Sequence, residues 1–288
     1  MSDGIQKGNR KNYMILKGDI TTLADIRLFL FDMDGTIYLG NNLFPFTKEM
    51  LSVIREQGKT YLFMTNNSSK SVSAYVEKLG KLGIDANEGD FITSSQATAL
   101  YLNANLPGKR LYVAGTESFK KELREAGVCV CEDYSDAIEG VVMGYDTELT
   151  YKKLDDVSRL LTEKDIPFIA ANPDLVCPTE YGYVPDCGSV CGMLFNATGK
   201  KPYYIGKPRP EMPLLAIEWM KKKDPSICKE NTLVIGDRMY TDIACGINAG
   251  VKTMLVLSGE TTEQQARETE YNIDYIVGDA SCIPDVLK

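Results

Sequence analysis

Leu28–Thr36 reads LFLFDMDGT, and this stretch decides the fold class. Four consecutive apolar residues, Leu28–Phe31, are typical of a strand that is buried on both faces of a parallel sheet. The strand ends at Asp32, and Gly35 permits the turn that follows. Asp32 and Asp34 are two residues apart, so both carboxylates can point into one pocket beyond the end of the strand.

Two later apolar runs repeat this arrangement of a buried strand followed by polar residues. Tyr61–Met64 runs into Thr65–Ser68, and Thr232–Ile235 runs into Gly236–Asp237. Alternating strands and amphipathic helices predict a doubly wound, Rossmann-like α/β core with a parallel sheet. In such folds, ligands bind at the carboxyl ends of the strands. The polar residues expected at those ends are Asp32, Thr65 and Asp237.

A second block of alternating strands and helices separates the two halves of this core. The breaker residues of Pro107–Gly108 and Gly199–Pro202 suit hinges on either side of it. The block is therefore predicted to be an inserted α/β domain. The expected organisation is an N-terminal tail at 1–22, core at 23–106, the inserted cap domain at 107–200 and core again at 201–288.

Composition excludes several classes of protein. The 288 residues carry a net charge of −8, which argues against binding to nucleic acid or to an anionic membrane. Met1–Ile20 lacks the apolar segment of a secretory signal, and no stretch approaches the roughly 18 apolar residues of a membrane span. The eight cysteines form no C-x-x-C pair. We therefore expect reduced thiols and a cytoplasmic location.

The residues that are missing restrict the chemistry. The chain has no histidine, which excludes Ser-His-Asp, Cys-His and histidine-phosphatase mechanisms. No cysteine is followed six positions later by the arginine of a cysteine-based phosphatase. Gly58–Thr60 resembles the end of a P-loop, but Val53 occupies the position of its first glycine. Carboxylates are left as the main candidates for catalysis.

Four motifs in order carry a family resemblance. Asp32–Thr36 resembles the first motif, DxDGT, of the haloacid dehalogenase (HAD) superfamily. Thr65–Asn67 is similar to the second motif, Gly206–Pro208 to the third and Gly236–Asp242 to the fourth. With Tyr38 and Asn172–Asp174 added, the set resembles the NagD-like, or 4-nitrophenylphosphatase, branch, which has a class II cap. The similarity spans roughly residue 25 to the end.

The resemblance implies a magnesium-dependent phosphomonoester hydrolase that works through an aspartyl-phosphate intermediate. Asp32 would be the nucleophile, and Asp34 would protonate the leaving oxygen and later accept a proton from water. Mg²⁺ would bind Asp32, Asp237 and the Asp34 carbonyl, since oxygen-only ligands favour this ion. Asp242 would lie behind these ligands and support them without binding the ion itself.

Four further residues are expected to bind phosphate or to support the acids. The Thr65 hydroxyl and the Asn66 backbone N–H would bind phosphoryl oxygens, and Lys207 would supply positive charge. Arg238 is expected to support the cluster by pairing with one of its acids.

The resemblance places the cap over the site, where it would select the substrate. Asn172, Asp174 and Tyr183 are the cap residues expected to approach the pocket, although packing within the cap is the favoured role for Tyr183. Pro185–Gly188 reads PDCG, where related chains more often have PGAG. The added carboxylate of Asp186 would either discourage highly anionic substrates or lie on the surface.

A small phosphorylated metabolite is the expected substrate, with 4-nitrophenyl phosphate as an artificial one. Phosphoglycolate, pyridoxal phosphate, glycerol phosphate and nucleoside monophosphates all remain open. Two alternative functions stay open. One is a phosphotransferase or mutase, and the other is a slow phosphate-sensing regulatory protein. Related proteins often pair through their caps, so a homodimer through the cap is one outcome, although the sequence does not fix the oligomeric state.

Overall fold

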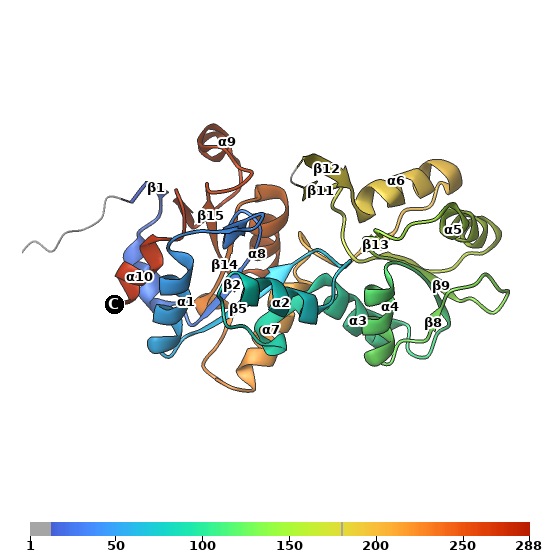
Figure 1. Ribbon diagram of the computed structural model, residues 1–288, viewed down its shortest axis with the longest axis horizontal. Helices are drawn as coiled ribbons and strands as arrows, with labels where there is room; N and C mark the ends of the chain where they lie inside the picture. The colour runs from blue at the N-terminus through green and yellow to red at the C-terminus, as the bar shows by residue number, and fades with distance from the viewer. Residues whose placement is uncertain (1–12, 180) are drawn as a thin grey trace, which may run out of the picture.

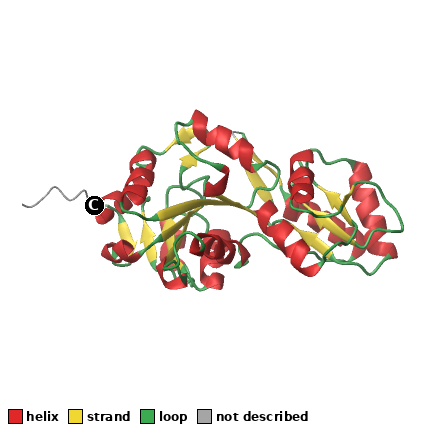
Figure 2. Cartoon of the chain, turned by 90° about the horizontal axis from the view of Figure 1, so that it is seen from below, coloured by secondary structure: helices red, strands yellow, loops and turns green. Residues whose placement is uncertain are grey.

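The computed structural model describes residues 13–179 and 181–288, which form two lobes side by side (Figures 1 and 2). The larger lobe contains a seven-stranded sheet in the order β1-β16-β15-β14-β2-β5-β6. All neighbouring strands are parallel except β1 and β16, which confirms the predicted α/β class. The strands are β1 (Ile15–Lys17), β2 (Leu28–Phe31), β5 (Thr60–Thr65), β6 (Phe91–Thr93), β14 (Thr232–Gly236), β15 (Lys252–Val256) and β16 (Tyr275–Val277).

Helices cover both faces of this sheet because its strands are apolar on both sides. All four side chains of β2 are buried. On one face lie α1 (Thr47–Glu56), α2 (Val72–Lys81) and α10 (Cys282–Leu287). On the other lie α3 (Ser94–Asn105), α7 (Glu211–Lys221) and α8 (Ala244–Ala249). The shorter elements of this lobe are η1 (Ile20–Asp25), η2 (Glu88–Asp90), η3 (Lys229–Asn231), the π-turn η4 (Met239–Ile243) and α9 (Glu263–Glu268).

The smaller lobe is the inserted cap. Its parallel sheet has the order β13-β10-β9-β7-β8. α4 (Glu117–Glu125) packs on the face toward the core lobe, whereas α5 (Tyr151–Glu163) and α6 (Cys187–Thr198) pack on the other face. The strands are β7 (Leu111–Ala114), β8 (Val130–Cys131), β9 (Gly140–Met143), β10 (Phe168–Ala170) and β13 (Tyr203–Tyr204).

The last strand of the cap sheet, β13, lies past the boundary of 200 that the sequence predicts. β13 pairs with β10 in the cap sheet, so we propose that the cap extends to Tyr204. A hairpin of β11 (Val176–Thr179) and β12 (Gly182–Pro185) leaves the cap sheet and stands above the space between the lobes (Figure 1). A smaller hairpin, β3 (Tyr38–Leu39) with β4 (Asn42–Leu43), follows the LFLFDMDGT stretch in the core lobe.

The two lobes share one apolar cluster. Leu62 of the core and Val113 of the cap both belong to it, as does Phe119 of α4. The cap is therefore packed against the core through buried side chains as well as joined to it by two chain crossings. In the part of the chain that the structure describes, no helix is long and apolar enough to cross a membrane.

Candidate active site

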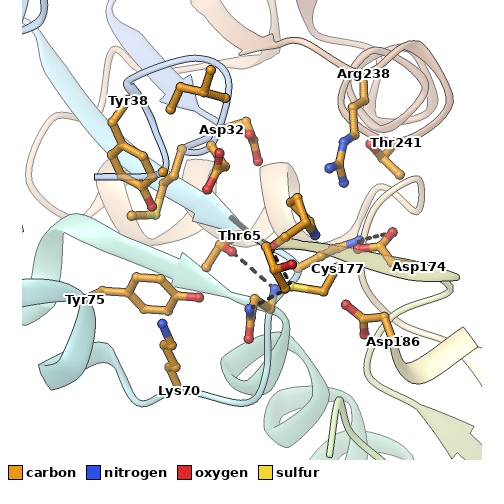
Figure 3. Close-up of a pocket in the computed structure, with 18 of the residues that line it drawn as sticks. Asp32, Tyr38, Thr65, Lys70, Tyr75, Asp174, Cys177, Asp186, Arg238 and Thr241 are labelled. Carbon is orange, nitrogen blue, oxygen red and sulfur yellow. Dashed lines mark hydrogen bonds between the residues drawn. The ribbon is translucent and has the colours of Figure 1, made fainter. Parts of the chain in front are cut away.

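Three adjacent strands bring the motif residues together. β14, β2 and β5 are neighbours in the core sheet, and their carboxyl ends lead directly to Asp237, Asp32 and Thr65. Lys207 reaches the same place on the chain that returns from the cap. A cleft of about 590 Å³ opens here between the core lobe and the β11–β12 hairpin (Figure 3). The sequence thus predicted where the polar residues converge.

Lys207 is held between two carboxylates. Its Nζ donates to Asp32 Oδ1 at 2.6 Å and to Asp242 Oδ1 at 2.6 Å, and the residue is only 3% exposed. Burial alone would lower the pKa of Lys207, but the carboxylates of Asp242 and Asp32 outweigh it and raise the pKa. The lysine is therefore a fixed positive charge beside Asp32, as expected for a group that binds phosphate.

The site contains more negative charge than Lys207 neutralises. Carboxylate oxygens of Asp32, Asp237 and Asp242 all lie within 4.8 Å of one another. Burial, and then repulsion from Asp242, raises the pKa of Asp32 well above its usual range. The same two causes raise the pKa of Asp237 to about 6. Such a cluster is electrostatically suited to a cation.

Asp237 supplies the more specific test of fit to a metal ion. Its Oδ2 accepts a hydrogen bond from the Glu260 N–H at 2.6 Å. Its Oδ1 is buried and has no hydrogen-bond partner among the described residues. A buried carboxylate oxygen without a donor is costly unless something binds it. The three carboxylates and this free oxygen fit a hard divalent cation such as Mg²⁺.

Two glycines make room for Asp237. A Cβ on Gly35, whose φ is +83°, would lie 2.5 Å from Asp237 Oδ2. A Cβ on Gly259 would lie 2.0 Å from the same oxygen. Gly35 of the DxDGT motif is therefore required both for the turn and for the close approach of this acid.

Asp34 lies apart from the group formed by the other three acids. It is half-buried and lines the cleft, and its main chain forms an isolated β-bridge with Tyr38. Its carboxylate is not in the cluster of Asp32, Asp237 and Asp242. This position fits the expected role of the Asp34 side chain, which is to transfer protons and not to bind the metal ion.

Asn66 has a structural role that the sequence did not reveal. Its Oδ1 accepts from the Lys207 N–H at 2.8 Å, and its Nδ2 donates to the Lys207 carbonyl at 3.0 Å. The same Nδ2 donates to Asp174 Oδ2 at 3.1 Å. A Cβ on Gly206 would lie 2.5 Å from Asn66 Oδ1, which explains the glycine before Lys207. Asn66 thus fixes the main chain that carries the lysine.

The expected cap residues have different positions. Asp174 lines the cleft, whereas Asn172 is fully buried behind it and donates to the Asn66 carbonyl at 2.9 Å. Tyr183 is 64% exposed and is not among the residues that line the cleft. The reason is that β11 borders the cleft and β12, which carries Tyr183, lies outside it.

Two other predictions need correction or refinement. Arg238 lines the cleft, but its Nε pairs with Glu260 at 2.8 Å and not with an acid of the cluster. Its backbone N–H donates to Asp242 Oδ2 at 3.1 Å, and its guanidinium lies close enough to Asp32 and Asp237 for their charges to raise the pKa of Arg238 despite burial. Asp186 is not at the surface: it is 3% exposed and lines the cleft. Its burial depends on the fold of the hairpin, which the local sequence does not specify.

Known proteins resemble this chain over most of its length. A family model of haloacid dehalogenase-like hydrolases matches residues 29–129, and a HAD-hydrolase-like model matches residues 204–281. An acid sugar phosphatase from Staphylococcus haemolyticus is 33% identical over 247 residues, which cover 86% of this chain and 91% of the relative. The chain belongs to the haloacid dehalogenase-like hydrolases. The stretch between the two matches contains most of the cap.

Solved structures place this HAD hydrolase among phosphatases. A 4-nitrophenylphosphatase from Thermotoga maritima has a TM-score of 0.84 at 34% identity, covering 93% of this chain and 99% of that one. A glycerol phosphate phosphatase from Mycobacterium tuberculosis, in complex with magnesium, has a TM-score of 0.81 at 29% identity, covering 92% and 77%. The chain is therefore a HAD phosphatase of the NagD and 4-nitrophenylphosphatase type.

Proposed function

We propose that this HAD phosphatase hydrolyses phosphomonoesters of small metabolites in a magnesium-dependent reaction that forms an aspartyl phosphate on Asp32. The observation that carries the proposal is the position of Asp32 in the cleft. One of its oxygens is 2.6 Å from the buried Lys207 ammonium, and Asp34 lines the same cleft. A nucleophile, a fixed cation and a candidate acid therefore surround one space.

The reaction would proceed in two displacements. In the first, an Asp32 oxygen attacks phosphorus, the bond to the leaving oxygen breaks, and Asp34 gives that oxygen a proton. In the second, water attacks phosphorus and gives a proton to Asp34, and the bond to Asp32 breaks to release phosphate. Lys207 and the Thr65 hydroxyl would bind the phosphoryl oxygens throughout, together with the Asn66 N–H.

The metal would have a supporting role in this scheme. Asp32, Asp237 and the Asp34 carbonyl would hold Mg²⁺, with Asp242 fixed behind them by Lys207. When bound, the ion supplies positive charge that lets a carboxylate approach a phosphate dianion. The magnesium complex of the M. tuberculosis relative and the free oxygen of Asp237 support this assignment.

The relatives narrow the substrate class. Their names include an acid sugar phosphatase, a 4-nitrophenylphosphatase and a glycerol phosphate phosphatase. The cleft volume of about 590 Å³ falls within the usual range of small-molecule sites. We infer that sugar or polyol phosphates are substrates. No feature of the described residues favours a phosphotransferase or a phosphate sensor over a hydrolase, and a homodimer through the cap stays a prediction.

The test is phosphate release from 4-nitrophenyl phosphate and a panel of metabolite phosphates, with Mg²⁺ or with a chelator. Asp32→Asn and Asp34→Asn are expected to lose turnover, and rapid quenching of the wild type is expected to trap a labelled phosphoenzyme. Asp165→Asn, at a cap carboxylate that is 99% exposed, removes the same charge as a matched control. Activity that survives the chelator or Asp32→Asn would refute the mechanism.

A further inference from the structure

The cap wall of the cleft carries two carboxyl groups. Asp174 and Asp186 both line the cleft, and Figure 3 shows them one above the other on the wall opposite Tyr75. Asp186 is the N-cap residue of α6, and its Oδ1 accepts a hydrogen bond from the Cys187 N–H at 2.5 Å. The Asn172 side chain also hydrogen-bonds to this carboxylate, but a carboxylate has about four acceptor sites, so capacity remains for further donors. Asp186 is thus a buried acceptor at the edge of the space that a substrate would enter.

Both sides of the cleft carry carboxylates, with Asp32, Asp34 and Asp242 on the core side, but the two sides differ in their cations. The described residues that the cap contributes to the lining include Asp174 and Asp186 but no lysine or arginine. All the lining cations come from the core lobe or from the chain returning to it: Lys70, Lys78, Lys207 and Arg238. A phosphoryl group bound beside Asp32 and Lys207 would therefore direct its leaving group toward an acidic wall.

We propose that Asp186 is a specificity-determining residue that favours leaving groups which are uncharged and bear hydroxyls, as in polyol and sugar phosphates, and disfavours those with a second anionic group. This inference rests on the proposed function. A hydroxyl donates a hydrogen bond to a carboxylate, whereas a second carboxylate or phosphate is repelled by it in a partly desolvated cleft. Selection by repulsion is a recognised route to specificity.

The environment of Asp186 makes its charge depend on pH near neutrality, and a purely structural role would not produce such a dependence of substrate preference. Burial raises the pKa of Asp186 to about 7, although the Cys187 N–H partly offsets the effect. The carboxyl should therefore become more fully ionised between pH 6 and pH 8, and its repulsion of anions should grow with it. The other charged or titratable groups near it are Asp174, Cys177, Cys187, Tyr75, Tyr145 and Arg238.

Two substrates of similar size isolate the effect. Glycerol 3-phosphate has hydroxyls beyond the phosphoester, whereas 2-phosphoglycolate has a carboxylate. The ratio of their kcat/KM values cancels the steps that the two reactions have in common. Asp186→Asn keeps the size of the side chain and its ability to begin α6. It is expected to shift the ratio toward 2-phosphoglycolate by about tenfold at pH 8, the order of effect of one nearby like charge.

The controls separate this inference from the proposed function. Asp165→Asn should leave the ratio unchanged, and the shift in Asp186→Asn should shrink at pH 6, where wild-type Asp186 is mostly protonated. A ratio within twofold of wild type at pH 8 would overturn the inference while hydrolysis of 4-nitrophenyl phosphate continues. If the wild type hydrolyses neither substrate, calorimetry can measure the binding of both substrates to Asp32→Asn and to the double variant Asp32→Asn/Asp186→Asn. An equal preference in the two proteins overturns the role of Asp186 in specificity. A shift of the preference toward 2-phosphoglycolate in the double variant supports it.

Discussion

The Asn66 side chain should control both the stability of the junction and the rate of the reaction. It forms two hydrogen bonds with the main chain of Lys207, 141 residues away, and a bifurcated one with both carboxylate oxygens of Asp174. Asn66→Ala removes all three. Because Lys207 is buried, its N–H and carbonyl would lose their partners without regaining water. The lysine would also be free to shift away from Asp32.

The magnitude follows from these contacts. A buried polar group without a partner costs roughly 1–3 kcal/mol, so two such groups on Lys207 suggest a loss of about 3 kcal/mol. For a protein of this size that corresponds to a melting temperature lower by about 5 °C. A displacement of the Lys207 ammonium by about 1 Å is expected to reduce kcat about 100-fold.

Thermal unfolding followed by circular dichroism and turnover of 4-nitrophenyl phosphate measure the two effects. Asn67→Ala is the matched control for stability, since Asn67 bonds mainly within its own turn, to the Ser69 N–H at 2.9 Å and hydroxyl at 2.7 Å. It is expected to lower the melting temperature by only about 2 °C. Asn66 does not hold the main chain of Lys207 in place if Asn66→Ala lowers the melting temperature no more than this control. The same conclusion follows if Asn66→Ala keeps kcat within about threefold of wild type.

Two further predictions concern stability. Burial raises the pKa of Glu122 from 4.5 to about 7, so the native protein keeps a proton that the unfolded chain releases, and stability is lost as pH rises between those values. Glu122→Gln cannot ionise and should be about 2–3 kcal/mol more stable than wild type at pH 8 but equal at pH 4, as urea unfolding at both pH values would show. In α6, a Cβ on Gly188 would lie 2.1 Å from the Pro173 carbonyl oxygen, whereas one on Gly192 would meet no atom within 4 Å. Gly188→Ala should therefore cost about 1–3 kcal/mol and Gly192→Ala should gain about 0.5–1 kcal/mol, and melting temperatures in the reverse order would refute this.

The core of the fold could be predicted because its signals are local. A run such as LFLF is buried on both faces wherever a parallel sheet is covered by helices, and the polar residue that ends it then lies at the ligand-binding edge. Asp32, Thr65 and Asp237 each follow this rule independently, and they lie at the ends of three neighbouring strands, with Asp32 and Asp237 in one carboxylate cluster. The sheet order decides which of these ends are adjacent.

The parts that could not be predicted depend on partners distant in the chain. Arg238 lies next to Asp237 in sequence, yet its guanidinium pairs with Glu260, whose N–H also fixes Asp237. Asp186 could have been at the surface, because nothing in PDCG indicates that the hairpin before it bends over the cleft. Tyr183 was expected at the pocket, but strand pairing places β11 and not β12 at the cleft.

The cap sheet and Lys207 are parts of one structural unit. Gly206 N–H donates to the Ala171 carbonyl at 2.9 Å, one residue past the end of β10. The next residue in the chain is Lys207, which Asn66 holds from the core side. Asn172 follows Ala171 and donates to the Asn66 carbonyl. The lysine is therefore positioned jointly by the cap sheet and by the end of β5, so a change that displaced the cap would alter catalysis as well as substrate choice.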